Sequence, residues 1–215
     1  MIGKTKKFNF KSLLILNTFA LLITSYFFEN FILLGVFTLS FIISLLTTKN
    51  GLKIIRKLNL LQNIRTEGPV SHYKKSNTPI MGGVFMIIPF LIFLLIITIS
   101  LGSLKLFLLL ISIFGFFTIG FVDDYLSIKN QKNTGLKAKE KFFLQSIISI
   151  IFIVLAYEKN LINPLITVSD SWGLNLNIFI LPISFLLLVG ISNSVNLTDG
   201  LDGLAAGCSG IVFYG

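Results

Sequence analysis

The sequence has little of what a soluble domain needs. Only 13% of its 215 residues are charged, whereas a soluble domain of this size carries about 25%. It has a single cysteine, so no internal disulfide can form, and the small apolar neighbours of Cys208 favour a packing role over redox or metal chemistry. Its single histidine, His72, lies in a polar loop, where a structural role is commoner than a catalytic one. The low content of charged residues, cysteine and histidine excludes most classes of soluble protein.

Apolar residues are what the sequence has in excess. Hydrophobic residues make up 54% of the chain, phenylalanine alone occurs 22 times, and the mean hydropathy is +0.88. A net charge of +9 would also suit a nucleic-acid-binding protein. Here, however, the basic residues lie between apolar runs, as they do in the cytoplasmic loops of membrane proteins. The composition therefore predicts a membrane protein that contacts membrane lipids and no nucleic acid.

Apolar runs long enough to cross a hydrocarbon core of about 30 Å recur along the chain. They predict an all-α fold, a polytopic transmembrane helical bundle that forms one integral-membrane domain over residues 1–215. The first run could instead lie in the membrane interface, and a cleavable signal peptide is disfavoured because no cleavage site follows it. The predicted spans lie near residues 12–28, 31–48, 79–101, 104–122, 142–157 and 176–193, and a seventh begins near residue 204.

The basic residues predict the orientation of the bundle. Sixteen of the eighteen lysines and arginines fall in residues 1–11, 49–78 and 123–141. By the positive-inside rule these segments face the cytoplasm, and the segment 194–203 then faces it as well. If residues 12–28 do not span the membrane, only the N-terminus changes side.

Two adjacent carboxylates, Asp123 and Asp124, follow the span 104–122 at its cytoplasmic end. They repel each other, and the end of a helix favours cations over anions. Such a pair is tolerated when its members share a proton or a cation, and Mg²⁺ suits because it takes oxygen ligands and bridges to phosphate. The pair therefore predicts a functional site, and the alternative is a solvated helix end.

A second polar cluster runs from Asn193 to Gly203. It offers oxygen ligands and permissive backbone at membrane depth, which is tolerated only where it lines a cavity or is buried in protein. Asp199 and Asp202 are three residues apart, so one helical turn would place both on the same face. An ordinary polar turn in which one aspartate caps the next helix is the alternative, but it does not explain the whole set.

Two basic segments lie on the same side of the membrane. Lys74, Lys75 and the helix start near Gly82-Gly83 suit an anionic phosphate, and the glycines permit a close approach of a helix or ligand. Residues 137–141 could attract acidic lipid headgroups or substrate phosphates. In both cases a loop that merely sets the topology explains the lysines almost as well.

Carboxylates and lysines together, without a serine–histidine arrangement, favour metal-assisted phosphoryl transfer. A membrane transporter or channel is the alternative of another class, in which the carboxylates would form a cation or proton path. It is disfavoured because the polar residues gather at one face rather than at the membrane midplane.

Three ordered motifs lie between residues 68 and 207: Gly68-Pro-x-Ser-His-x-x-Lys75-x-x-Thr78-Pro-x-Met-Gly-Gly83, Gly120-Phe-x-Asp-Asp-Tyr125 and Asn193-Ser-Val-Asn-Leu-Thr-Asp-Gly-Leu-Asp-Gly-Leu-Ala-Ala-Gly207. They resemble the motifs of the bacterial phospho-N-acetylmuramoyl-pentapeptide transferases, in glycosyltransferase family 4. The resemblance extends to Gly135-Leu-x-x-x-x-Lys141-Phe-x-x-Gln145. The related UDP-GlcNAc:undecaprenyl-phosphate transferases share the paired aspartates and usually differ in the Asn-Leu-Thr-Asp segment, and they remain the alternative within the same class.

The resemblance implies a reaction, its partners and its site residues. Phospho-MurNAc-pentapeptide would pass from UDP-MurNAc-pentapeptide to undecaprenyl phosphate, giving lipid I and UMP for peptidoglycan synthesis. The reaction would need Mg²⁺ and take place at the cytoplasmic face of the bacterial inner membrane, and a homodimer is compatible with it. Motif matching implies catalytic roles for Asp123, Asp124, Asn196 and Asp199, of which the adjacent pair would also be metal ligands, and substrate-binding roles for Lys75, Thr78, Lys141, Gly200, Leu201 and Asp202.

The chain departs from the family pattern in three respects. Ile80 stands where the family usually has threonine, and Ser127 stands where a basic residue is common. Family members have about ten spans, and this chain stops at Gly215, inside its predicted seventh. The resemblance places a third aspartate, the main Mg²⁺ ligand, and a histidine-rich loop in the part beyond. We therefore expect the 215 residues to be a fragment that is inactive alone.

Overall fold

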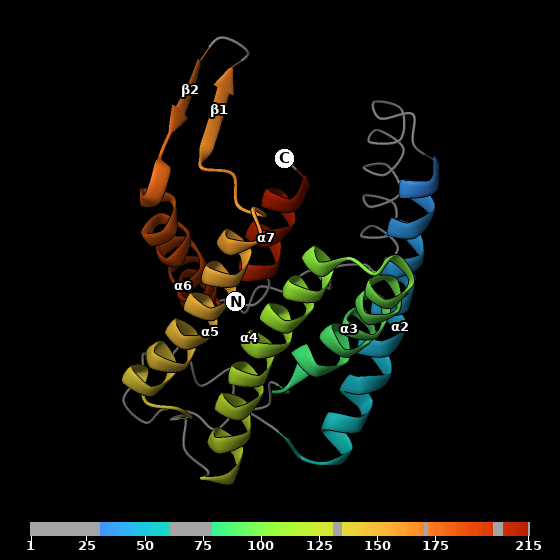
Figure 1. The fold of residues 1–215 in the computed structure, drawn as a ribbon. Helices are drawn as coiled ribbons and strands as arrows, with labels where there is room; N and C mark the ends of the chain where they lie inside the picture. The colour runs from blue at the N-terminus through green and yellow to red at the C-terminus, as the bar shows by residue number, and fades with distance from the viewer. Residues whose placement is uncertain (1–30, 61–78, 131–134, 170–171, 200–203, 215) are drawn as a thin grey trace, which may run out of the picture.

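Long apolar helices make up most of the described residues of the computed structural model (Figure 1). The structure describes residues 31–60, 79–130, 135–169, 172–199 and 204–214. A two-stranded hairpin and a short 3₁₀ turn, η2, connect α5 to α6. The elements are α2 (Phe31–Lys57), α3 (Gly82–Leu101), α4 (Leu104–Lys129), α5 (Ala138–Glu158), β1 (Leu165–Ser169), β2 (Trp172–Asn175), η2 (Asn177–Phe179), α6 (Ile180–Thr198) and α7 (Leu204–Tyr214).

Four of these helical segments are long and apolar enough to cross a membrane. They are α3, α4, α5 and Asn177–Thr198, with mean hydropathies between 1.7 and 3.0. The predicted all-α, polytopic membrane fold is therefore confirmed. A helix also begins at Leu204, as predicted, whereas the predicted span 12–28 lies outside the described residues.

Several helices extend beyond the predicted spans. The predicted ends at residues 122 and 193 are wrong for the helices, because α4 continues to Lys129 and α6 to Thr198. Likewise α5 begins at Ala138 rather than near residue 142, and α2 continues past residue 48 to Lys57. Hydropathy marks only the part of a helix that suits hydrocarbon, whereas backbone hydrogen bonding continues into polar turns. Much of what the sequence predicted as polar loop is therefore helix end.

Helices that are consecutive in the chain pack against each other from α2 to α6. Glycine permits close contact at two of these interfaces. A side chain at Gly51 of α2 would overlap the ring of Phe85 in α3, and one at Gly115 of α4 would crowd Ile148 in α5. Most large apolar side chains of the described residues are exposed, as expected for helices whose outer surface faces lipid.

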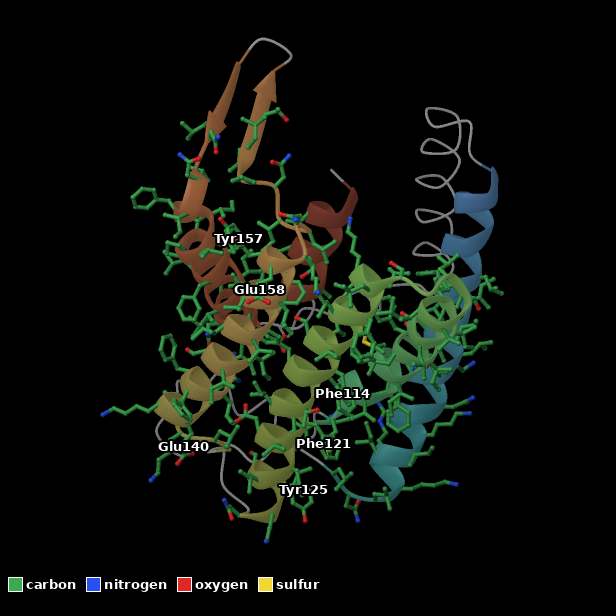
Figure 2. The ribbon with its side chains drawn as sticks, viewed as in Figure 1. Phe114, Phe121, Tyr125, Glu140, Tyr157 and Glu158 are labelled. Carbon is green, nitrogen blue, oxygen red and sulfur yellow. The ribbon has the colours of Figure 1, made fainter. Side chains whose placement is uncertain are left out.

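The connection between α5 and α6 forms an antiparallel hairpin in which Ile166 pairs with Leu174. The sequence predicted only a connection between the spans 142–157 and 176–193 here. Four- and five-residue strands leave a weak sequence signal, and their pairing depends on cross-strand contacts. The hairpin stands at one end of the bundle, while Tyr125 near the end of α4 and Glu140 at the start of α5 lie at the other (Figures 1 and 2). The polar site is therefore remote from the hairpin.

Candidate active site

The carboxylate of Asp123 lies where α4, α5 and the segment before α5 meet. The Lys141 Nζ atom is 3.1 Å from Asp123 Oδ2, and the Leu136 amide donates to Oδ1 at 2.8 Å. Both side chains are partly shielded, with 16% of Lys141 and 27% of Asp123 exposed. Hydrogen bonds that involve a charged group are short and strong. Asp123 is therefore held by two donors, as a residue in a fixed site would be.

Gly135 makes this arrangement possible. A Cβ atom at this position would overlap the backbone carbonyl oxygen and the carboxylate of Asp123. Only glycine lets the segment come so close that the next amide, that of Leu136, reaches the carboxylate. The sequence showed Gly135 only as part of a motif, because its contact with α4 depends on helix packing.

Asp124 turns toward a different neighbour. The Met81 amide, at the start of α3, donates to Asp124 Oδ2 at 3.2 Å. Met81 has a φ of 65°, a left-handed conformation that costs a residue with a side chain about 1–2 kcal/mol. The start of α3, at the end of the first basic segment, therefore contacts the aspartate pair, whereas the sequence predicted only that both lie on the same side of the membrane. A side chain at Gly82 or Gly83 would meet no described atom within 4 Å, so no described helix uses the close approach that these glycines permit.

The protein's own donors relieve the repulsion between the two carboxylates. Successive residues on a helix point about 100° apart, and accordingly Asp123 faces α5 while Asp124 faces α3. The described residues contain no group of three or more histidine, cysteine or acidic side chains that could hold a metal. Two carboxylates nevertheless fit Mg²⁺, which is commonly bound through one or two carboxylates together with substrate phosphates. The metal role stays a prediction.

A buried polar link lies one helical turn beyond Lys141. Gln145 is 2% exposed, and its Nε2 donates to Ser192 Oγ at 3.2 Å. In return Asn193 Nδ2 donates to Gln145 Oε1 at 2.7 Å, and also to the backbone carbonyl of Val189 at 2.8 Å. Buried amides are costly unless paired, so the two bonds of the Gln145 side chain fix α5 against α6. The spacing of four between Lys141 and Gln145 places them on one face of α5.

Sequence interpretation missed the role of Gln145, which it noted only as part of a motif. Ser149 continues the same face and is fully buried, and its hydroxyl has no partner in the part of the chain that the structure describes. A polar residue at every fourth position of an apolar helix is the signal that could have revealed this face.

The other predicted site residues are placed less closely or not at all. Asn196, in the last turn of α6, and Asp199, just after it, are exposed and make no hydrogen bond or ion pair with the described residues around Asp123. The structure therefore joins Lys141 to Asp123 without bringing Asn196 and Asp199 into contact with either aspartate of the pair. Lys75, Thr78, Gly200, Leu201 and Asp202 lie outside the described residues.

Comparisons with known proteins agree with one another. The profile of glycosyl transferase family 4 matches residues 106–215. Proteins named phospho-N-acetylmuramoyl-pentapeptide-transferase resemble the chain: the one from Prochlorococcus marinus strain MIT 9312 is 82% identical over all 215 residues. A relative of the same name from Halalkalibacterium halodurans is 37% identical over 184 residues, which are 85% of this chain and 57% of that protein. The chain spans 60% of the length of the MIT 9312 relative.

Proposed function

Because this chain belongs to glycosyl transferase family 4, we propose that it transfers phospho-MurNAc-pentapeptide from UDP-MurNAc-pentapeptide to undecaprenyl phosphate, giving lipid I and UMP. The observation that carries the proposal is the 82% identity, over the whole chain, to a protein named for this transferase activity. The cluster of Asp123, Asp124 and Lys141 supports it, because phosphoryl transfer depends on positioning and charge neutralisation.

In this reaction a phosphate oxygen of the polyprenyl lipid attacks the β-phosphorus of the nucleotide sugar. The bond from that phosphorus to the oxygen bridging the α-phosphate breaks, and UMP leaves with the bonding electrons. We assign the neutralisation of phosphate charge to Lys141, whose ammonium Asp123 holds in place at 3.1 Å. Asp123 and Asp124 would deprotonate the lipid phosphate or order the metal region.

We further propose that Mg²⁺ takes part and is held by Asp123 and Asp124, with its main ligand beyond the described residues. When bound, the ion would offset negative charge on the phosphates. Asp124 suits this role because its only hydrogen bond among the described residues comes from the Met81 amide, which leaves acceptor capacity.

The remaining assignments follow the motif match. Asn196 and Asp199 would line the cleft beside the sugar, at the same end of the bundle as the aspartates. The distribution of lysine and arginine supports a cytoplasmic active site, and the reaction implies the bacterial inner membrane. A homodimer is part of the proposal.

The residues proposed to contact the substrates are Lys75, Thr78, Lys141, Gly200, Leu201 and Asp202.

The test uses a chimera in which this chain replaces the matching part of the MIT 9312 relative, with which it is 82% identical. The purified chimera should release UMP from UDP-MurNAc-pentapeptide when Mg²⁺ and undecaprenyl phosphate are present, and the 215-residue chain alone should not. Release from UDP-GlcNAc instead would favour the alternative transferase. An ion flux through vesicles without UMP release would favour a transporter.

A further inference from the structure

One exposed face of α2 changes from apolar to basic along its length. Side chains at steps of three or four residues share a helix face. On this face Leu39, Ile42 and Leu46 are 58%, 52% and 57% exposed, as lipid-facing side chains would be. At the same spacing, the following residues on this face are exposed and basic. We call these four residues the basic end of α2: Lys49, Lys53, Arg56 and Lys57.

The predicted span 31–48 within α2 places these cations at the lipid headgroups and just beyond them. The helix has 27 residues, so it is about 40 Å long, against about 30 Å of hydrocarbon. If residues 31–48 cross the hydrocarbon, the remainder extends about 13 Å beyond it. A bilayer with its headgroups is about 40–45 Å thick. One headgroup layer therefore accounts for about 5–8 Å on each side. Lys49 and Lys53 lie at headgroup depth, and Arg56 and Lys57 lie a few ångströms beyond it, within a Debye length of the charged surface.

The opposite face of α2 packs on the protein. Gly51 and Ile55 are buried, and Gly51 lies against Phe85 of α3. In contrast, nitrogen-tipped side chains point away from the bundle along this end of α2 (Figure 2). Within the described ranges no carboxylate lies within salt-bridge distance of the four cations, and the ion pair that is present joins Lys141 to Asp123. The basic end of α2 thus faces the surroundings, away from the candidate active site.

We propose that the basic end of α2 binds the phosphates of anionic glycerophospholipids in the adjoining leaflet. The occupant is a lipid because the cations continue a face that is already lipid-exposed, so an acyl chain beside Leu46 brings its own headgroup to Lys49 and Lys53. Each basic residue near an anionic surface favours association about five-fold. Lipid binding at the basic end of α2 does not depend on the proposed transferase activity.

The 215-residue chain, reconstituted in phosphatidylcholine vesicles, tests the proposal with spin-labelled phosphatidylglycerol as the probe. The ratio of its association to that of spin-labelled phosphatidylcholine gives the selectivity. The test variant carries Lys49→Gln, Lys53→Gln, Arg56→Gln and Lys57→Gln. The control variant loses the same charge from four other exposed lysines, through Lys105→Gln, Lys129→Gln, Lys139→Gln and Lys159→Gln.

The test variant should lose selectivity for phosphatidylglycerol about ten-fold or more, and the control variant should stay within about two-fold of the parent. Circular dichroism should give equal helix content for all three proteins, so that a loss is not caused by unfolding. Equal losses in both variants, or no loss in the test variant, would overturn the proposal. Displacement of the labelled lipid by millimolar inorganic phosphate would also overturn it, because the cations would then bind soluble anions. Displacement by equimolar polyprenyl phosphate would overturn it as well, because the surface would then bind a substrate.

Discussion

Replacing Gly135 with alanine tests whether the Leu136 amide holds the Asp123 carboxylate in its working position. The added methyl group would overlap both the backbone carbonyl and the carboxylate of Asp123. A backbone carbonyl within a helix cannot rotate away, so the segment before α5 must move outward instead. That movement takes the Leu136 amide away from Oδ1, which it now reaches at 2.8 Å.

The size of the effect follows from the bond that is lost. A hydrogen bond to a charged group contributes about 1.5–3 kcal/mol. Because 27% of the Asp123 side chain is exposed, water replaces part of the lost interaction, and the lower end of that range applies. Each 1.36 kcal/mol corresponds to a factor of ten in rate. We therefore expect Gly135→Ala to lower kcat/KM about ten-fold, and further if Lys141 is displaced too.

The assay is steady-state release of UMP by the chimera described above. Gly190→Ala is the matched control, because a side chain at Gly190 of α6 would meet no described atom within 4 Å. Alanine is also the better helix former there. Activity of Gly135→Ala within two-fold of the parent would refute the reasoning, and so would an equal loss in Gly190→Ala.

Three further substitutions test the site and the packing. Lys141→Met should lower UMP release about 100-fold, because it removes a charge and leaves a partly shielded carboxylate unpaired, and Lys141→Arg should recover part of the activity. Gln145→Leu should lower the free energy of unfolding by about 1–3 kcal/mol, because the Asn193 amide loses one of its two acceptors and the Ser192 hydroxyl loses its donor. Denaturant titration of the chain in detergent measures this, and an unchanged unfolding midpoint would contradict the link. Gly51→Ala should destabilise the chain by about 1–3 kcal/mol, and adding Phe85→Ala should restore part of the loss if the ring is the obstacle.

The sequence by itself identified this chain as a helical membrane protein, and it predicted that the polar site residues face the cytoplasm. Apolar runs predicted the helices α3 to α6 because spanning segments must satisfy their backbone hydrogen bonds internally. The adjacent carboxylates of Asp123 and Asp124 stood out because paired charges are costly beside a membrane. These signals are local, and each can be read within one helix.

Tertiary structure decided which of those groups meet. Asp123 contacts Lys141 across a separation of 18 residues, and Gln145 contacts Asn193 across 48. No local pattern specifies these partners, because they depend on how α4, α5 and α6 pack. The importance of Gly135 likewise depends on the distance between its segment and α4. Hydropathy and charge act on each residue alone, whereas a site requires side chains from separate helices to converge, and only the packed bundle brings them together.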